Sequence, residues 1–229
     1  MKKLIISQTA ATPVVIDSSA SLVLEPGVKA VVFEKPTSEM TIEVTLKENS
    51  ELTFISICNT STNTKRTITL QGKGSAYSEH TILVGKGNDK IDITSTVINE
   101  AKESKAKVEV RGVLDGNSQA HVVGNMRVKH GACKSDSRLS QHLLLLDNAR
   151  AEAFPYLEID ENDVTAGHAA TVRPIDPEHL FYLRSRGLSE NEARALLVQS
   201  FVMPAILGLP EAIRKQVEQQ LGELHVLLA

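Results

Sequence analysis

The chain has 229 residues, of which 41% are hydrophobic and 23% are charged, a composition typical of one globular domain with a small appendage. There are 25 lysines and arginines against 28 aspartates and glutamates, so the net charge of −3 lacks the basic excess that usually marks nucleic-acid binding. Aromatic residues make up only 3%, which removes most of the stacking surface used in carbohydrate and single-strand recognition.

The start of the chain and its apolar segments predict a cytoplasmic protein with no membrane partner. The apolar opening ends at Ser7, too early for a secretory signal. No apolar run reaches the roughly 18 to 20 residues that span a bilayer, and the longest candidate, 195–209, is interrupted by polar residues and a proline. Cys58 and Cys133 form no C-x-x-C motif, so each is expected to be a small buried hydrophobic residue rather than a metal ligand or a nucleophile.

From about residue 13 to residue 172, short runs alternate apolar and polar residues, as strands with one buried face do. Clear examples are the runs 42–47, 67–71, 91–94 and 108–111. Turn residues separate the runs, which recur roughly every 10 to 14 residues with no helical pattern between them. This spacing fits a sandwich, a barrel or a solenoid. The scarcity of aromatic residues and the abundance of threonine favour the solenoid.

After residue 172 the apolar period becomes helical. Asp176 and Pro177 predict the start of a short helix that ends at Gly187. The segment 189–192 is a capping box that opens a second helix, with a kink expected at Pro204. The residues expected to form the apolar stripe of this helix are Ala193, Leu196, Leu197, Ser200 and Phe201.

Gly208 is expected to end the second helix, and Pro210 and Glu211 to begin a third, whose apolar stripe runs from Ile213 to Leu228. The residues after 172 are therefore predicted to form a helical subdomain of about 55 residues. A unit of this size rarely has a stable core of its own, so it should lean on the solenoid or on a partner.

The chain carries no motif for catalysis or phosphate binding, such as a P-loop, a nucleophile elbow, an H-E-x-x-H zinc site or an EF-hand. An alternative interpretation is a β-solenoid enzyme or lectin-like module acting on polysaccharide, in which Asp160, Asp163 and Arg173 would be acid, base and anion clamp. The low aromatic content argues against it. Among the seven histidines, His168 stands out because its small neighbours Gly167 and Ala169 leave the imidazole unobstructed.

Several segments between residues 112 and 201 together resemble the SufB/SufD family, whose members are scaffold subunits of the Suf iron–sulfur cluster assembly system. The resemblance covers roughly the last 120 residues, whereas residues 1–111 agree only in pattern. The segments that carry it most specifically are Leu157-Glu158-Ile159, Asn162-Asp163-Val164, Gly167-His168-Ala169-Ala170-Thr171-Val172 and Phe181-Tyr182-Leu183-Arg184-Ser185-Arg186-Gly187.

This resemblance implies a right-handed parallel β-helix over residues 1–172 and a helical subdomain over 173–229 that docks a SufC-type ABC ATPase. It also implies that the β-helix pairs with a SufB-like subunit or with a second copy of this chain, and that a nascent iron–sulfur cluster forms at the pairing interface. A structural homo-oligomer that has kept the fold without the chemistry is a further possibility left open by the sequence.

The resemblance also assigns candidate residues. This chain has Ser140 where the SufB branch carries the cysteine of the sulfur path, and Ala169 where that branch has an acidic residue after the interface histidine. His168 matches the histidine that the SufD branch contributes, so the closer likeness is to SufD. We therefore expect a non-catalytic subunit with His168 as the candidate cluster and metal ligand, and a cluster that is transient and absent from the isolated chain.

The helical subdomain supplies the remaining candidates. Leu180, Phe181, Leu196 and Leu197 are expected to pack it. The residues expected to contact the ATPase are Phe181, Arg184, Arg186 and Arg194, as a basic rim around an apolar centre.

Overall fold

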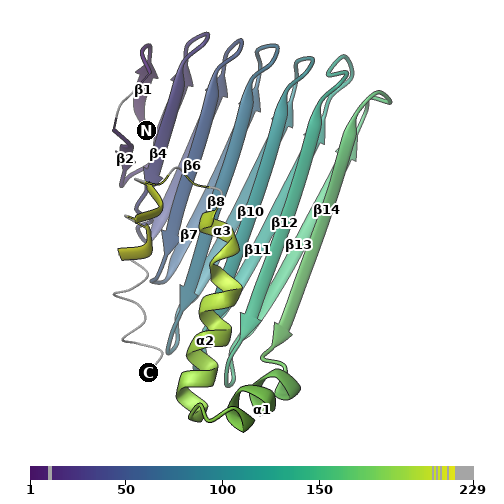
Figure 1. The fold of residues 1–229 in the computed structure, drawn as a ribbon. Coiled ribbons are helices and arrows are strands. Elements are labelled where there is room, and N and C mark those ends of the chain that lie inside the picture. The colour runs from purple at the N-terminus through teal and green to yellow at the C-terminus, as the bar shows by residue number, and fades with distance from the viewer. Residues whose placement is uncertain (10–11, 208, 210, 212, 216, 220–229) are drawn as a thin grey trace.

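The computed structural model describes residues 1–9, 12–207, 209, 211, 213–215 and 217–219. Fourteen strands form two seven-stranded sheets, and the chain passes from one sheet to the other after each strand (Figure 1). The strands of each sheet pair in parallel. This arrangement is a parallel β-solenoid, which confirms the choice of the solenoid over a sandwich or a barrel.

The odd-numbered strands form the first sheet, here called the odd sheet, in the order β1 (Lys2–Ile6), β3 (Ala20–Leu24), β5 (Glu39–Leu46), β7 (Thr62–Leu70), β9 (Lys90–Asn99), β11 (Gln119–Val128) and β13 (Arg150–Ile159). The even-numbered strands form the second, the even sheet, in the order β14 (Thr165–Pro174), β12 (Asp136–Leu145), β10 (Lys105–Leu114), β8 (Ala76–Gly85), β6 (Glu51–Cys58), β4 (Lys29–Glu34) and β2 (Val14–Ile16).

The strands lengthen along the chain, from 5 residues in β1 to 10 residues in β13 and β14. The solenoid therefore widens toward the end formed by the last two strands (Figure 1). β13 and β14 are edge strands of their sheets. No other described strand covers this last coil, so the core between the sheets ends there in an open face.

The core between the two sheets is built almost entirely from aliphatic side chains, as the alternating pattern requires. Phe54 and Tyr77 are its aromatic members. Residues of neighbouring coils stack in register, for example Leu46 on Leu70 and Val108 on Leu139. A narrow core of stacked aliphatic residues explains how a chain with so few aromatic residues can bury enough apolar surface to fold.

Three helices follow the solenoid: α1 (Pro177–Ser185), α2 (Glu190–Val202) and the single turn α3 (Pro204–Leu207). The Asp176 side chain caps α1 by accepting a hydrogen bond from the Glu178 backbone N–H, and Ser189 and Glu192 form the predicted capping box of α2. The kink expected at Pro204 is a break, because α2 ends at Val202 and α3 begins two residues later.

Beyond α3, residues 211, 213–215 and 217–219 are helical, in agreement with the predicted third helix. Its expected start at Pro210 and the end of the second helix at Gly208 lie outside the described residues, as do the members of its stripe after residue 219. In the described part of the chain, no helix is long and apolar enough to cross a membrane.

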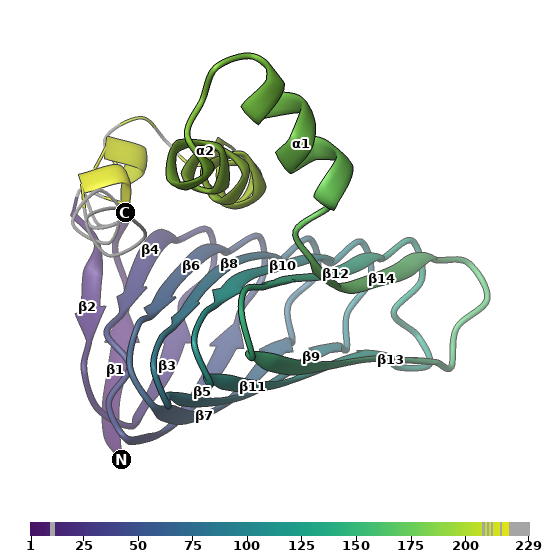
Figure 2. The same ribbon diagram turned by 90° about the horizontal axis from the view of Figure 1, so that it is seen from below.

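The helices lie along the outer face of the even sheet, and the outer face of the odd sheet carries none of them (Figure 2). A second apolar core forms at this contact. The buried members from the solenoid are Phe33, Ile55, Ile57, Ile82, Val84, Val113, Leu144 and, just after β12, Leu146. Those from the helical region are Val198, Val202, Ala205, Ile206, Leu209, Ile213 and Val217. The helical region is therefore a second layer on the solenoid. The last strand, β14, extends to Pro174, two residues beyond the boundary at 172 that the sequence predicts.

This packing corrects the predicted stripe of the second helix. Ala193, Val198 and Val202 are the buried residues of α2, whereas Leu196 is 44% exposed. Phe181 on α1 is 75% exposed and so does not pack the helical region as expected. The physical reason is that α2 rests on a broad apolar sheet rather than between other helices, so the sheet selects which side of the helix is buried.

Candidate functional site

His168 lies on β14, the edge strand of the even sheet, where it pairs in register with Leu139 of β12. Register partners in a parallel sheet point to the same face. Leu139 is fully buried between the sheets, so the imidazole of His168 lies on the interior-facing side of the last coil. His168 is nevertheless exposed, because the last coil leaves this side open. The structure thus places the imidazole at the open end of the solenoid.

The residues around this open end are mostly small or apolar. Ala151, Ala153 and Leu157 of β13 are half-buried and pack against the main core. Ile159 and Val172, in register with buried Val128 and Leu143, are large and exposed on the two edge strands, at 43% and 38%. The last coil therefore presents an apolar rim with one imidazole on it.

Gln141, one coil inward from this end, was missed by the sequence reasoning. It is fully buried and pairs in register with Ala170, two residues beyond His168 on β14. Neither polar atom of its side chain has a hydrogen-bond partner among the described residues. The available sequence signal is a polar residue at an inward position of β12, between Leu139 and Leu143. A buried amide of this kind has free capacity both to donate and to accept a hydrogen bond.

Within the described part of the chain, no group of three or more His, Cys, Asp or Glu side chains is placed to hold a metal ion. Cys58 and Cys133 are free thiols. Cys58 is buried on β6, four strands away from β14 in the even sheet, and burial raises the pKa of its thiol to about 11. Cys133 lies in the turn between β11 and β12. His168 is therefore a single candidate ligand, and the described residues supply no further ligands beside it to complete a metal site.

The two positions at which the chain departs from the SufB pattern are neighbours. Ser140 on β12 pairs in register with Ala169 on β14, one residue beyond the pair formed by Leu139 and His168. Because side chains alternate along a strand, Ser140 and Ala169 lie on the outer side of the even sheet. A hydroxyl and a methyl group at these positions offer neither a thiolate nor a carboxylate.

The three residues of the polysaccharide interpretation are not brought together. Asp160 and Asp163 lie in the turn before β14, whereas Arg173 lies near the other end of that ten-residue strand. At about 3.3 Å per residue, the strand separates them by about 30 Å. Acid, base and anion clamp must meet at one substrate atom, so this combination is wrong.

The helical region presents an exposed surface on α1. Phe181 and Tyr182 are 75% and 55% exposed. Arg186 donates a hydrogen bond from Nη2 to the Tyr182 hydroxyl at 3.2 Å, and its guanidinium lies 5.2 Å from the centre of that ring. Arg184 pairs with Glu190 at 3.3 Å. Two exposed aromatic rings on α1 thus lie beside Arg184 and beside Arg186, the residue that follows the end of the helix.

Arg194, the fourth residue predicted for this surface, has a different role. Its Nη2 lies 3.0 Å from Oδ1 of Asp147, in the turn between β12 and β13. Arg194 therefore ties α2 to the solenoid instead of extending the exposed surface of α1.

Comparison with known proteins identifies a protein family whose sequence model this chain matches. The model of the "SUF system FeS cluster assembly, SufBD core domain" matches residues 37–201. The iron–sulfur cluster assembly protein SufD of Bacillus subtilis is 36% identical over 158 residues, which cover 68% of this chain and 36% of that protein. A SufBD family protein of Mycobacterium leprae is 36% identical over 127 residues, which cover 55% of this chain and 14% of that protein. A SufBD family protein of Methanothermobacter thermautotrophicus is 32% identical over 151 residues, which cover 66% of this chain and 36% of that protein.

Each of these matches therefore spans little more than a third, or less, of the relative's own length.

Proposed function

Because the chain belongs to the SufB/SufD family of iron–sulfur cluster assembly proteins, we propose that it is a SufD-like, non-catalytic scaffold subunit. The observation that carries this proposal is the position of His168 on the interior-facing side of the last coil, exposed at the open end of the solenoid. An imidazole in this place is accessible to a second protein that covers the open end.

The edges of the last coil support pairing with such a protein. β13 and β14 each have one side with no strand partner among the described residues, and unpaired strand edges favour association with another chain. Exposed Ile159 and Val172 add apolar area beside these edges. The partner is a SufB-like subunit or a second copy of this chain.

The cluster is the cargo of this interface. Iron accepts imidazole as one ligand, but typical clusters take four thiolates, and this chain has only Cys58 and Cys133, on separate elements. The remaining ligands come from the partner. The cluster is accordingly transient, forms in the assembled complex, and is not held by the isolated chain.

The exposed surface of α1 is the proposed contact for a SufC-type ABC ATPase. Phe181 and Tyr182 supply an apolar centre, and Arg184 and Arg186 supply a charged rim, which is a common arrangement in protein interfaces. Arg194 is excluded from this contact because it pairs with Asp147.

The test is complementation of a cell that depends on this protein, with His168→Ala compared with His130→Ala. His130 is a matched control because its side chain is 92% exposed in a turn. Both variants should unfold within about 1 kcal/mol of the wild type, as surface substitutions do. His168→Ala should abolish cluster assembly in the cell, whereas His130→Ala should support it. Normal growth with His168→Ala would overturn the proposal.

A further inference from the structure

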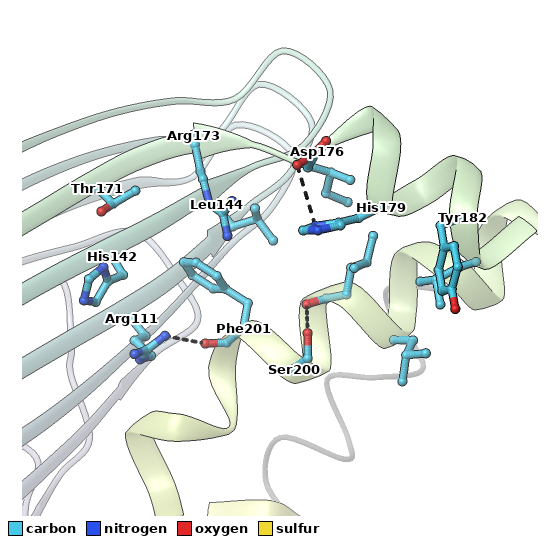
Figure 3. Close-up of a pocket in the computed structure, with 14 residues that line it drawn as sticks. Arg111, His142, Leu144, Thr171, Arg173, Asp176, His179, Tyr182, Ser200 and Phe201 are labelled. Carbon is cyan, nitrogen blue, oxygen red and sulfur yellow. Dashed lines mark hydrogen bonds and ion pairs between the residues drawn. The ribbon is translucent and has the colours of Figure 1, made fainter.

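A cleft of about 740 Å³ lies between the outer face of the even sheet and the helices α1 and α2 (Figure 3). It is separate from the open end of the solenoid, because its residues on β12 and β14 point to the opposite side of the sheet from Leu139 and His168. Pockets for small organic ligands usually have volumes of roughly 300 to 1,000 Å³. The cleft is therefore large enough for such a ligand.

The floor of the cleft carries a row of polar side chains across three neighbouring strands. Arg111 of β10 pairs in register with His142 of β12, which pairs with Thr171 of β14. Arg173 lies two residues beyond Thr171 on the same face, opposite Leu144. Two guanidinium groups, an imidazole and a hydroxyl thus face one space (Figure 3).

These cationic groups keep free hydrogen-bonding capacity. Arg111 donates from Nε to Glu109 at 2.8 Å and from Nη1 to the carbonyl oxygen of Phe201 at 2.9 Å, while its Nη2 makes no hydrogen bond to the described residues. Arg173 takes part in no ion pair or side-chain hydrogen bond in the described part of the chain. A guanidinium carries five N–H donors, so both arginines can bind an anion.

The charge around His142 is positive. Burial lowers the pKa of His142, and Arg111 and Arg173 lower it further, against the opposing charge of Glu109. The carboxylate that lines the cleft belongs to Asp176, at the start of α1. It is engaged there by the backbone N–H of Glu178, 2.9 Å away, and faces His179 at 3.7 Å. Arg111 is therefore already paired with Glu109 at 2.8 Å, whereas Arg173 has no carboxylate partner among the described residues.

The roof of the cleft is apolar. Leu196, Leu197 and Phe201 of α2 line it, together with Leu183 of α1. The ring of Phe201 lies 5.6 Å from the guanidinium of Arg111, so the apolar and the cationic parts are in direct contact. A ligand that fills this cleft must combine an anionic group with an apolar body.

We propose that the cleft binds a small organic phosphate, with its phosphate held by Arg111, His142 and Arg173 and its apolar body against Phe201 and Leu197. Two arginines with a hydroxyl beside them suit a dianionic, multi-acceptor phosphate better than a single carboxylate. Because the ligand would contact both the sheet and the two helices, its binding stabilises their docked arrangement.

The test measures binding to the full chain by calorimetry with three probes: 1-naphthyl phosphate, 1-naphthol and inorganic phosphate. The proposal requires saturable binding of naphthyl phosphate that is at least about tenfold tighter than that of either part alone, since charged hydrogen bonds and apolar burial both contribute. Equal affinity for naphthol would overturn the role of the arginines. Equal affinity for inorganic phosphate would overturn the role of the apolar roof.

Two variants locate the site. Arg173→Ala should weaken the binding of naphthyl phosphate by about tenfold or more. Arg127→Ala is the matched control, because Arg127 is an exposed arginine on the odd sheet, paired with Glu158 at 2.6 Å. The bound phosphate should also raise the pKa of His142, followed by NMR of its imidazole, because it offsets the two arginine charges. Equal binding by Arg173→Ala and wild type, or an unchanged His142 titration at saturating ligand, would overturn the assignment.

Discussion

Arg66 is the largest side chain that the solenoid buries completely. Its guanidinium pairs with Glu34 and lies 2.7 Å from Glu79, and it also donates hydrogen bonds to Ser56 and Thr81. Burial alone would lower the pKa of Arg66, but the charges of Glu34 and Glu79 outweigh it and raise the pKa. The group is therefore charged, and it holds three strands of the even sheet to β7 in the odd sheet.

Glu79 completes this network with neutral donors. The hydroxyl groups of Tyr77, Thr81 and Ser95 donate hydrogen bonds to its carboxylate at 2.8 to 2.9 Å. Nearly every polar atom of this buried cluster is thus paired. A buried ion pair contributes little net stability by itself, but removal of one partner leaves an uncompensated charge.

Arg66→Met should therefore destabilise the protein by about 3 to 5 kcal/mol at pH 7, measured by urea unfolding. The exposed control Arg127→Met should cost about 1 kcal/mol or less. A loss below about 1 kcal/mol would contradict this explanation.

The sequence could not predict this cluster, because it depends on which strands come together in space. Alternation places Arg66 on the same face as Ile68 and Leu70, but a charged side chain is almost never fully buried unless it is paired, and the sequence does not show the partners. Only the register of the coils, with Arg66 on Ser95 and Phe54 on Glu79, brings those partners together. The strand pattern places Gln141 inward but does not show that its amide lacks a partner, and His168 stays a candidate chosen because its segment resembles one family.

At the scale of elements, local signals predicted the starts of the first two helices well and their packing poorly. The caps Asp176 and Ser189 act within one turn of chain, so the sequence alone specifies them. The buried side of α2 is decided by a sheet whose apolar outer face comes from residues more than a hundred positions earlier, such as Ile55 and Ile82. The exposure of Leu196 follows from this distant partner.

The contact between α3 and β8 depends on the protonation state of His80. Its Nδ1 lies 2.7 Å from the carbonyl oxygen of Ala205, which can only accept, so Nδ1 carries the hydrogen. Burial lowers the pKa of His80, although the Ala205 carbonyl and the charges of Glu109 and Glu79 oppose this and Lys107 assists it. The docked state therefore favours the neutral imidazole.

Acid should accordingly loosen α3. The pKa of His80 is lower in the docked state than in the free chain, where it is about 6.5, so stability is lost as the pH falls through this range. Hydrogen exchange at the Ile206 and Leu207 amides, corrected for intrinsic rates, should speed up by at most about tenfold per pH unit below 6.5. His80→Gln should remove this pH dependence, and His130→Gln should keep it. Exchange that stays independent of pH in the wild type would contradict the role of His80.

At the scale of the whole molecule, two cores share one sheet. The inner side of the even sheet packs against the odd sheet, and its outer side packs against the helical region. Short-range periodicity revealed the inner core, since it requires only alternation. The outer core was hidden because β6 and β8 are buried on both faces but mix polar residues with their apolar ones, so the sequence does not show the second buried face.

Truncation after Pro174 tests whether the two layers are independent. The solenoid keeps all fourteen strands in this variant, so circular dichroism should still show a β-rich protein. Loss of the helices uncovers Phe33, Ile55, Ile82 and Val113 along one continuous face of the even sheet. Such exposed patches cause association. The truncated chain should therefore form oligomers in light scattering and bind the dye anilinonaphthalene sulfonate, unlike the full chain.

Polar substitutions on this face supply the control. Ile82→Thr and Val113→Thr together retain β-branched side chains suited to strands but shrink the apolar patch. The truncated chain with both substitutions should therefore be largely monomeric. Thr94→Ser and Thr96→Ser on the odd sheet should not have this effect, because they leave the patch unchanged. A truncated chain that is monomeric without any substitution would show that the helices are a separable domain, and that the sheet does not need them as its second layer.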